Sequence, residues 1–270
     1  MPPGMIALFG SGETARHGRQ IHEALLRTLA SPIRIAIVET PAGFQPNVDV
    51  VSRKLQAFFE QRLQNFKPEV RVVAARRRGG PYDCDSAAIA APLEEASYIF
   101  AGPGSPSYAA RHLRGTRTLD LICRRHEEGA ALALSSAAAI AAGQFALPVY
   151  EIFKVGDDPH WLPGLDLFAR LGLRLTIVPH WNNAEGGSEL DTSHAYVGAE
   201  RFAALRAMLP AATTILGIDE HTACLLDPVA RSGRVMGAGG VTVLSGDRET
   251  VLADGAAFPF DLLTMRDPAG

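Results

Sequence analysis

The sequence predicts an α/β fold: a doubly wound, mostly parallel sheet with helices on both faces and an antiparallel edge formed by the C-terminal part of the chain. Short apolar runs alternate with helical patterns through most of the chain, which is typical of parallel strands joined by helices. From Thr214 onward, strand-like pieces follow one another directly, which favours antiparallel pairing. We expect residues 1–270 to form a single domain, because 47% of them are hydrophobic and no linker interrupts the pattern.

The individual elements follow from periodicity and from glycine or proline at their ends. In the first expected helix, Ile21, Leu25 and Leu29 share one face. The expected strands are residues 5–9, 33–38, 70–74, 98–101, 130–134 and 173–178, followed by the tail pieces TILGI, ACLLD, RVMGAG, VTVLSG and ETVLAD. The expected helices are residues 17–29, 48–59, 87–96, 119–128, 137–142 and 199–209.

Charge and cysteine content exclude several classes of protein. The net charge of −3 is spread over mixed segments, so we expect no nucleic-acid partner, and we interpret the basic run 76–78 as a solvated loop. The apolar stretch near the N-terminus is too short for a signal peptide or a membrane span, which predicts a cytoplasmic protein. Cys84, Cys123 and Cys224 form no CxxC or Cys/His pattern, so we expect no disulfide, metal or cofactor. The sequence is compatible with either a monomer or a homodimer.

Chemically informative residues follow four of the expected strands. In open α/β sheets, functional residues gather at the carboxyl ends of the strands. We therefore expect the site at the following positions: residues 10–13, residues 102–105, Ser135 with Ser136, and His180.

Ser136 lies at a sharp turn between an expected strand and an expected helix. A serine in such a turn holds its hydroxyl above the sheet, and the first amides of the helix point to where an oxyanion would form. This placement favours Ser136 as a nucleophile. The alternative is that the serine pair only packs there or caps the helix.

A serine nucleophile needs a base and an acid that orients it. His180 follows an expected strand, and from the end of a strand its imidazole can extend to the serine hydroxyl. His17, His22, His112 and His126 lie on helical segments and are expected to be structural, whereas His160, His194 and His221 lie in loops and remain alternatives. The candidate acids after the serine turn are Glu151, Asp157 and Asp158.

These residues resemble the cyanophycinase and aspartyl dipeptidase (dipeptidase E) family of serine peptidases, which has the class I glutamine amidotransferase-like fold. Residues 134–139 (LSSAAA) are similar to the Gly-Thr-Ser-Ala-Gly-Ala type turn of that family. Residues 100–104 (FAGPG) are similar to its Phe-Thr-Gly-Gly loop, and residues 217–223 (GIDEHTA) to a late Gly-Ile-Asp-Glu segment. The resemblance covers most of the chain, from Gly10 to about Asp254.

The resemblance implies a role for each matched residue. Ser136 would be the nucleophile, His180 the base and Glu151 the orienting acid. The amides of Gly104 and Ala137 would form the oxyanion hole. Since Pro103 has no N–H, the donor in the loop of residues 100–104 would have to be Gly102 or Gly104. The further residues expected to contact substrate are Ser105, Asn182, Asn183 and Glu185.

We therefore predict a serine peptidase or amide hydrolase that acts on a small peptide or amide substrate through a Ser-His-Glu triad. The alternative is a catalytically inactive relative that binds a small ligand or a partner in the same crevice. Leu134 and Ala138 motivate this alternative, because they replace the two glycines of the serine turn. Glutamine-dependent amide transfer is disfavoured, since the true amidotransferases use a cysteine and a His-x-Glu pair where this chain has Ser136 and residues 180–182 (HWN).

Overall fold

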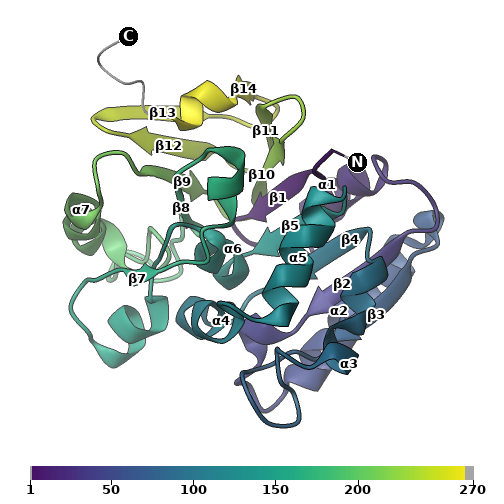
Figure 1. Ribbon diagram of the computed structural model, residues 1–270. Helices are drawn as coiled ribbons and strands as arrows, with labels where there is room; N and C mark the ends of the chain where they lie inside the picture. Colours follow the sequence, from purple (N-terminus) through teal and green to yellow (C-terminus); the bar gives the residue numbers. More distant parts are fainter. Residues whose placement is uncertain (1, 265–270) are drawn as a thin grey trace.

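A mostly parallel sheet of eight strands forms the centre of the computed structural model, which describes residues 2–264 (Figure 1). The strand order is β14-β11-β10-β1-β5-β4-β2-β3. Five of these strands are parallel, and β10, β11 and β14 extend the sheet in antiparallel pairing beyond β1. The strands are β1 (Ile6–Phe9), β2 (Arg34–Val38), β3 (Glu69–Val73), β4 (Tyr98–Ala101), β5 (Ala131–Ser135), β10 (Thr222–Asp227), β11 (Ser232–Gly237) and β14 (Ala257–Pro259).

A second sheet of four strands, in the order β13-β12-β9-β8, accounts for most of the remaining strands. Its members are β8 (Leu175–Val178), β9 (Thr214–Ile218), β12 (Val241–Ser245) and β13 (Arg248–Leu252), and β6 (Phe145–Ala146) pairs separately with β7 (Leu162–Pro163). The predicted antiparallel edge is thus divided between two sheets. Strand β9 lies in the second sheet, where it pairs antiparallel with β12 on one side and parallel with β8 on the other.

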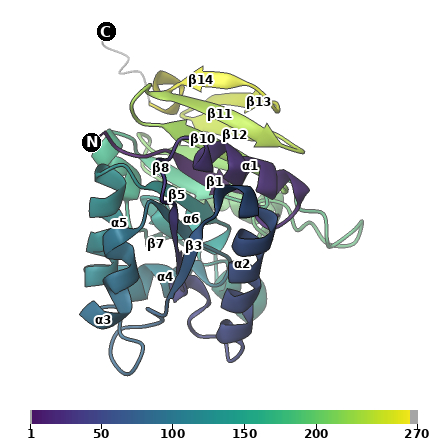
Figure 2. The ribbon, with the colours of Figure 1, turned by 90° about the vertical axis from the view of Figure 1, so that its right-hand side faces the viewer.

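Helices cover both faces of the eight-stranded sheet, which confirms the predicted fold class. In Figure 2, α1 and α2 lie on one side of the sheet and α3 and α5 on the other. No helix in residues 2–264 is long and apolar enough to cross a membrane. The helices are α1 (Arg16–Leu26), α2 (Val48–Arg62), α3 (Ala87–Ala90), α4 (Pro106–Leu113), α5 (Arg117–Glu127), α6 (Ala137–Ala142) and α7 (Gly198–Met208). Shorter turns are the 3₁₀ helices η1 (Thr40–Ala42), η2 (Gln64–Phe66), η3 (Ala91–Glu95), η5 (Leu167–Leu171) and η6 (Phe260–Leu263), and the π-helix η4 (Glu151–Val155).

Two helices differ from the prediction. The expected helix over residues 87–96 is α3 followed by η3, because Pro92 has no N–H to continue an α-helical ladder. The prediction missed α4, where Ser105 accepts a hydrogen bond from the amide of Tyr108 and Pro106 occupies the first turn. The single-domain prediction includes Met1 and residues 265–270, which lie outside the described residues.

Two large clusters of the core lie on opposite faces of the large sheet. Side chains of a strand alternate between faces, so Ala7 and Phe9 of β1 pack with α1 and α2, while Ile6 and Leu8 pack on the opposite side. On that opposite side the core includes α5, α6 and residues of the second sheet, such as Ile177. The second sheet is therefore fixed against the first by shared apolar burial.

His22 of α1 is a fully buried histidine in the core. Its Nε2 lies 3.0 Å from the carbonyl oxygen of Glu13, which can only accept, so Nε2 carries the proton and Nδ1 accepts from the hydroxyl of Tyr98. The rings of Phe9 and Phe59 lie around it, at centroid distances of 5.0 and 5.1 Å. Burial lowers the pKa of His22 to about 3, against the smaller opposing effect of its bond to Glu13.

The buried imidazole should make stability depend on pH. Between about pH 6.5 and pH 3 the unfolded chain binds a proton at residue 22 and the folded protein does not, so the free energy of unfolding should decrease as the pH decreases, by up to about 1.4 kcal/mol per pH unit. His22→Gln should make this dependence shallower, as measured by urea unfolding at several pH values. His17→Gln, on the same helix but only partly buried, is the control. An unaltered dependence in His22→Gln would contradict the assignment.

Candidate active site

Ser136 occupies the sharp turn between β5 and α6. Its backbone has φ 50° and ψ −111°, a region that non-glycine residues rarely adopt, and its amide donates to the carbonyl of Phe9 at 3.1 Å. The neighbouring Ser135 is fully buried, and its hydroxyl donates to Oε2 of Glu13 at 2.9 Å. Of the two serines, only Ser136 borders a cavity.

His180 follows β8 and contacts both Ser136 and Glu220. Its Nε2 lies 2.9 Å from Oγ of Ser136, and its Nδ1 lies 2.8 Å from Oε1 of Glu220. When ionised, a carboxylate can only accept, so Nδ1 carries the proton and Nε2 is left to accept from the serine hydroxyl. This tautomer is the one in which an imidazole can take a proton from a serine.

Glu220 lies in the short turn between β9 and β10 and is held by two asparagines. Its Oε1 also accepts from Nδ2 of Asn183 at 2.9 Å, and its amide donates to Oδ1 of Asn182 at 2.8 Å. Burial tends to raise the pKa of Glu220, but the hydrogen bonds from His180 and Asn183 outweigh it and lower this pKa below its ordinary value. Glu220 therefore faces the imidazole as a carboxylate.

Strand pairing places His180 beside Glu220. Strands β8 and β9 are parallel and in register, with Val178 opposite Gly217, so the residues just beyond them leave the sheet side by side. The amide of Trp181 donates to the carbonyl of Ile218 at 3.1 Å, which continues this pairing past the strands.

The turn after β1 supports the turn that carries Glu220. A Cβ at Gly10 would lie 2.0 Å from the carbonyl oxygen of Asp219, so only glycine permits this approach. The amide of His221 donates to Oγ of Ser11 at 3.1 Å. The glycine turn predicted as part of the site thus holds the acidic turn in place.

The structure does not bring Glu151 to His180, which corrects the predicted partner. Glu151 lies in η4, and its Oε1 accepts a hydrogen bond from the hydroxyl of Ser107. Neither Asp157 nor Asp158 is bonded to His180 either. The physical reason is the strand order: the residues adjacent to the end of β8 are those that follow β9, whereas Glu151 belongs to the segment that precedes β8.

Of the four residues predicted to contact substrate, only Glu185 borders the cavity. Ser105 is buried and caps α4, with its hydroxyl accepting from the amide of Tyr108 at 3.2 Å. Asn182 and Asn183 bond to Glu220 instead, and Asn183 is only 3% exposed. Asn183 thus holds the carboxylate of Glu220 and Asn182 holds its backbone amide.

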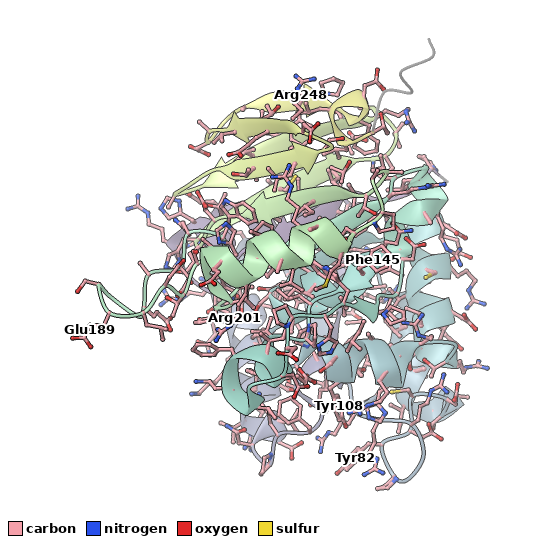
Figure 3. All side chains as sticks on the ribbon, turned by 90° about the vertical axis from the view of Figure 1, so that its left-hand side faces the viewer. Tyr82, Tyr108, Phe145, Glu189, Arg201 and Arg248 are labelled. Carbon is pink, nitrogen blue, oxygen red and sulfur yellow. The ribbon has the colours of Figure 1, made fainter. Side chains whose placement is uncertain are left out.

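A cavity of about 570 Å³ opens beside Ser136, a size within the range of about 300–1,000 Å³ usual for small-molecule sites. Gly104 and Ala137, the predicted oxyanion residues, both line it. Ala137 is the first residue of α6, so its amide has no acceptor within the helix. The loop between β8 and α7 forms another wall, and Figure 3 shows Glu189 of this loop projecting from the body of the molecule.

The alternative histidines in loops have other contacts. Nδ1 of His160 lies 2.9 Å from the carbonyl oxygen of Asp158, and Nδ1 of His194 lies 2.7 Å from Oγ of Ser193. The His194 ring also stacks on Phe202, at a centroid distance of 4.4 Å.

Within residues 2–264, no group of three histidine, cysteine, aspartate or glutamate side chains is arranged to hold a metal ion.

Comparisons with known proteins give the fold. No protein-family model matches the chain, and no curated protein matches it. A solved structure of a peptidase from an acI-B1 actinobacterium superimposes with a TM-score of 0.76 at 21% identity, over 96% of this chain and 97% of that one. A protein from Listeria monocytogenes EGD-e described as "Putative Peptidase E Protein" superimposes with a TM-score of 0.52 at 13% identity, over 93% of this chain and 98% of that one. The chain therefore has the fold of these two proteins.

Gly104 should tolerate no side chain. Its φ is 154°, and a Cβ would lie 1.9 Å from the carbonyl oxygen of Pro41. We expect Gly104→Ala to decrease the free energy of unfolding by about 2–4 kcal/mol, from backbone strain and the steric clash together. Gly79→Ala is the matched control, because Gly79 also has a positive φ but has open space around it, and it should cost roughly 1 kcal/mol. Equal losses in urea unfolding would show that the close contact with Pro41 is unimportant.

Proposed function

We propose that the chain is a serine hydrolase of the peptidase type, acting on a small peptide or amide substrate through Ser136, His180 and Glu220. The observation that carries the proposal is the unbroken hydrogen-bonded series from the Ser136 hydroxyl through the imidazole to the Glu220 carboxylate, at the edge of a cavity. The fold shared with two proteins described as peptidases supports the same reaction class.

The geometry suits acyl transfer in two stages. Oγ of Ser136 attacks the carbonyl carbon while Nε2 of His180 takes its proton, and the carboxylate of Glu220 stabilises the imidazolium. The amides of Gly104 and Ala137 donate to the oxyanion of the tetrahedral intermediate. His180 then protonates the leaving amine as the C–N bond breaks. Water, deprotonated by His180, attacks the acyl-enzyme, releases the acid and restores the serine.

Two observations weigh against the other functions considered. Ser136 keeps its positive φ although Leu134 and Ala138 replace the glycines, and the Leu134 side chain is buried in the core. The retained turn favours an active serine over an inactive relative. Cysteine-dependent amide transfer is disfavoured because burial raises the pKa of the Cys84 thiol to about 11 and that of Cys224 to about 12.

A fluorophosphonate probe should label Ser136 covalently. Ser136→Ala should abolish labelling, and His180→Ala should slow it by roughly 10²-fold or more, because the hydroxyl loses its base. Intact-protein mass spectrometry with peptide mapping gives the rate and the position. Ser135→Ala is the control and should label normally, since Ser135 is buried against Glu13. Absence of labelling in the unaltered protein would refute the nucleophile.

The two candidate acids can be separated by a matched pair of substitutions. Glu220→Gln should reduce kcat by roughly 10³–10⁴-fold on any substrate, because the amide no longer stabilises the imidazolium and can favour the wrong tautomer. Glu151→Gln should retain activity within a few-fold, because a glutamine oxygen can still accept the bond from Ser107. Steady-state kinetics of the two variants decides between them, and a greater loss in Glu151→Gln would reverse the assignment.

A further inference from the structure

The cavity beside Ser136 has an apolar wall. Ala137, Ile140, Val149 and Ala195 line it and are 1, 2, 8 and 1% exposed, and Ile140, Val149 and Ala195 belong to one buried cluster. These side chains have their partners in the core and present no hydrogen-bonding atom to a ligand. A charged or polar group placed against this wall would lose its hydration without compensation.

Aromatic rings continue this wall up to the imidazole. The rings of Phe153 and Tyr196 lie 5.6 Å apart, and those of Tyr196 and His180 lie 5.4 Å apart. Burial and the nearby carboxylates of Glu185 and Glu220 raise the pKa of Tyr196 to about 12, so this ring remains a neutral phenol at neutral pH. An apolar group bound here would lie directly beside the reacting hydroxyl.

The charges of the cavity lie at its mouth. Among the described residues, the lysine and the glutamate that line it are Lys154 and Glu185, and both side chains are exposed to solvent. Nζ of Lys154 lies 4.5 Å from the centre of the Phe153 ring. An exposed ammonium is well hydrated and interacts only weakly with a carboxylate. No arginine lines the cavity among the described residues, so no guanidinium there can form bidentate hydrogen bonds with an acidic side chain.

A second group of aromatic side chains flanks the cavity. The ring of Phe44 lies 5.3 Å from that of Tyr108 and 6.5 Å from that of Tyr150, and Tyr150 also lines the cavity. Phe44 is 45% exposed and Tyr150 is 40% exposed. Exposed aromatic rings at the mouth of a pocket provide further apolar contact area for a peptide.

We propose that the cavity selects peptides with an apolar or aromatic side chain next to the scissile amide, and disfavours an acidic one. The inference rests on the proposed hydrolase function for the position of the scissile amide. The apolar wall itself can be tested without catalysis, so the two proposals can fail separately.

Binding to the Ser136→Ala variant tests the selectivity directly. The ligands are the tripeptides Ala-Phe-Ala, Ala-Leu-Ala, Ala-Asp-Ala and Ala-Lys-Ala, measured by isothermal titration calorimetry. We expect Kd values for the Phe and Leu peptides to be at least roughly 10-fold lower than for the Asp and Lys peptides. Equal affinities, tighter binding of the Asp peptide, or no binding of any peptide would overturn the inference.

Substitutions in the same background locate the binding wall. Phe153→Ser and Leu190→Ser remove apolar groups that line the cavity, and each should weaken binding of the Phe peptide by about 10-fold. Val155→Ser is the matched control: Val155 is 75% exposed, follows Phe153 by two positions and does not line the cavity. The Kd of the Val155→Ser variant for the Phe peptide should change by less than about twofold. Equal losses in Phe153→Ser and Val155→Ser would place the peptide elsewhere.

The fluorophosphonate result keeps the two proposals apart. Labelling of Ser136 together with a preference for the Asp peptide would leave the hydrolase intact and overturn the apolar selectivity. Preference for the Phe and Leu peptides without labelling would support the selectivity and refute the nucleophile. As a positive test, Phe153→Arg should change the preference toward the Asp peptide, because it places a cation where the ring now lies.

Discussion

The parallel pairing of β8 with β9 is the constraint on which the site depends. With Val178 opposite Gly217, the chain leaves both strands at the same edge, and His180 meets Glu220 without any long connection. Gly217 also makes room for the ring of Trp181, because a Cβ there would lie 2.4 Å from the indole. A shift of one residue in this register would turn the acid away from the imidazole. The hydrogen bonds that Asn182 and Asn183 make with Glu220 stabilise the same arrangement.

Much of the fold could be predicted because it depends on local patterns. Apolar runs such as residues 33–38 and 98–101 predicted β2 and β4 closely, and helix α6 was predicted with the bounds it has. The pairing of the tail strands could not be predicted. Residues 214–218 are apolar on both faces, which fits a strand in either sheet, and only tertiary packing assigns them to β8 instead of β1.

The site was predictable where it follows from strand ends and not where it depends on which strands are neighbours. Ser136 and His180 each follow an apolar run, so their positions at strand ends are enough to predict both as site residues. Glu220 also follows such a run, within the segment GIDEHTA, but no local pattern pairs that run with the one before His180. Glu151 was preferred for its place in the chain, although the chain between Ser136 and His180 contributes a cavity wall rather than the acid.

Ser136 extends from the large sheet and His180 from the small one, so the bond between serine and imidazole spans two separately hydrogen-bonded units, while Glu220 lies in the turn that links β9 of the small sheet to β10 of the large one. Those units are joined by apolar side chains and not by a shared ladder. Partial loosening of that interface would therefore separate Ser136 from His180 while both sheets kept their own hydrogen bonds. Heat or denaturant would then break the contact between Ser136 and His180 before secondary structure is lost, and a ligand that contacts both sheets would stabilise their arrangement.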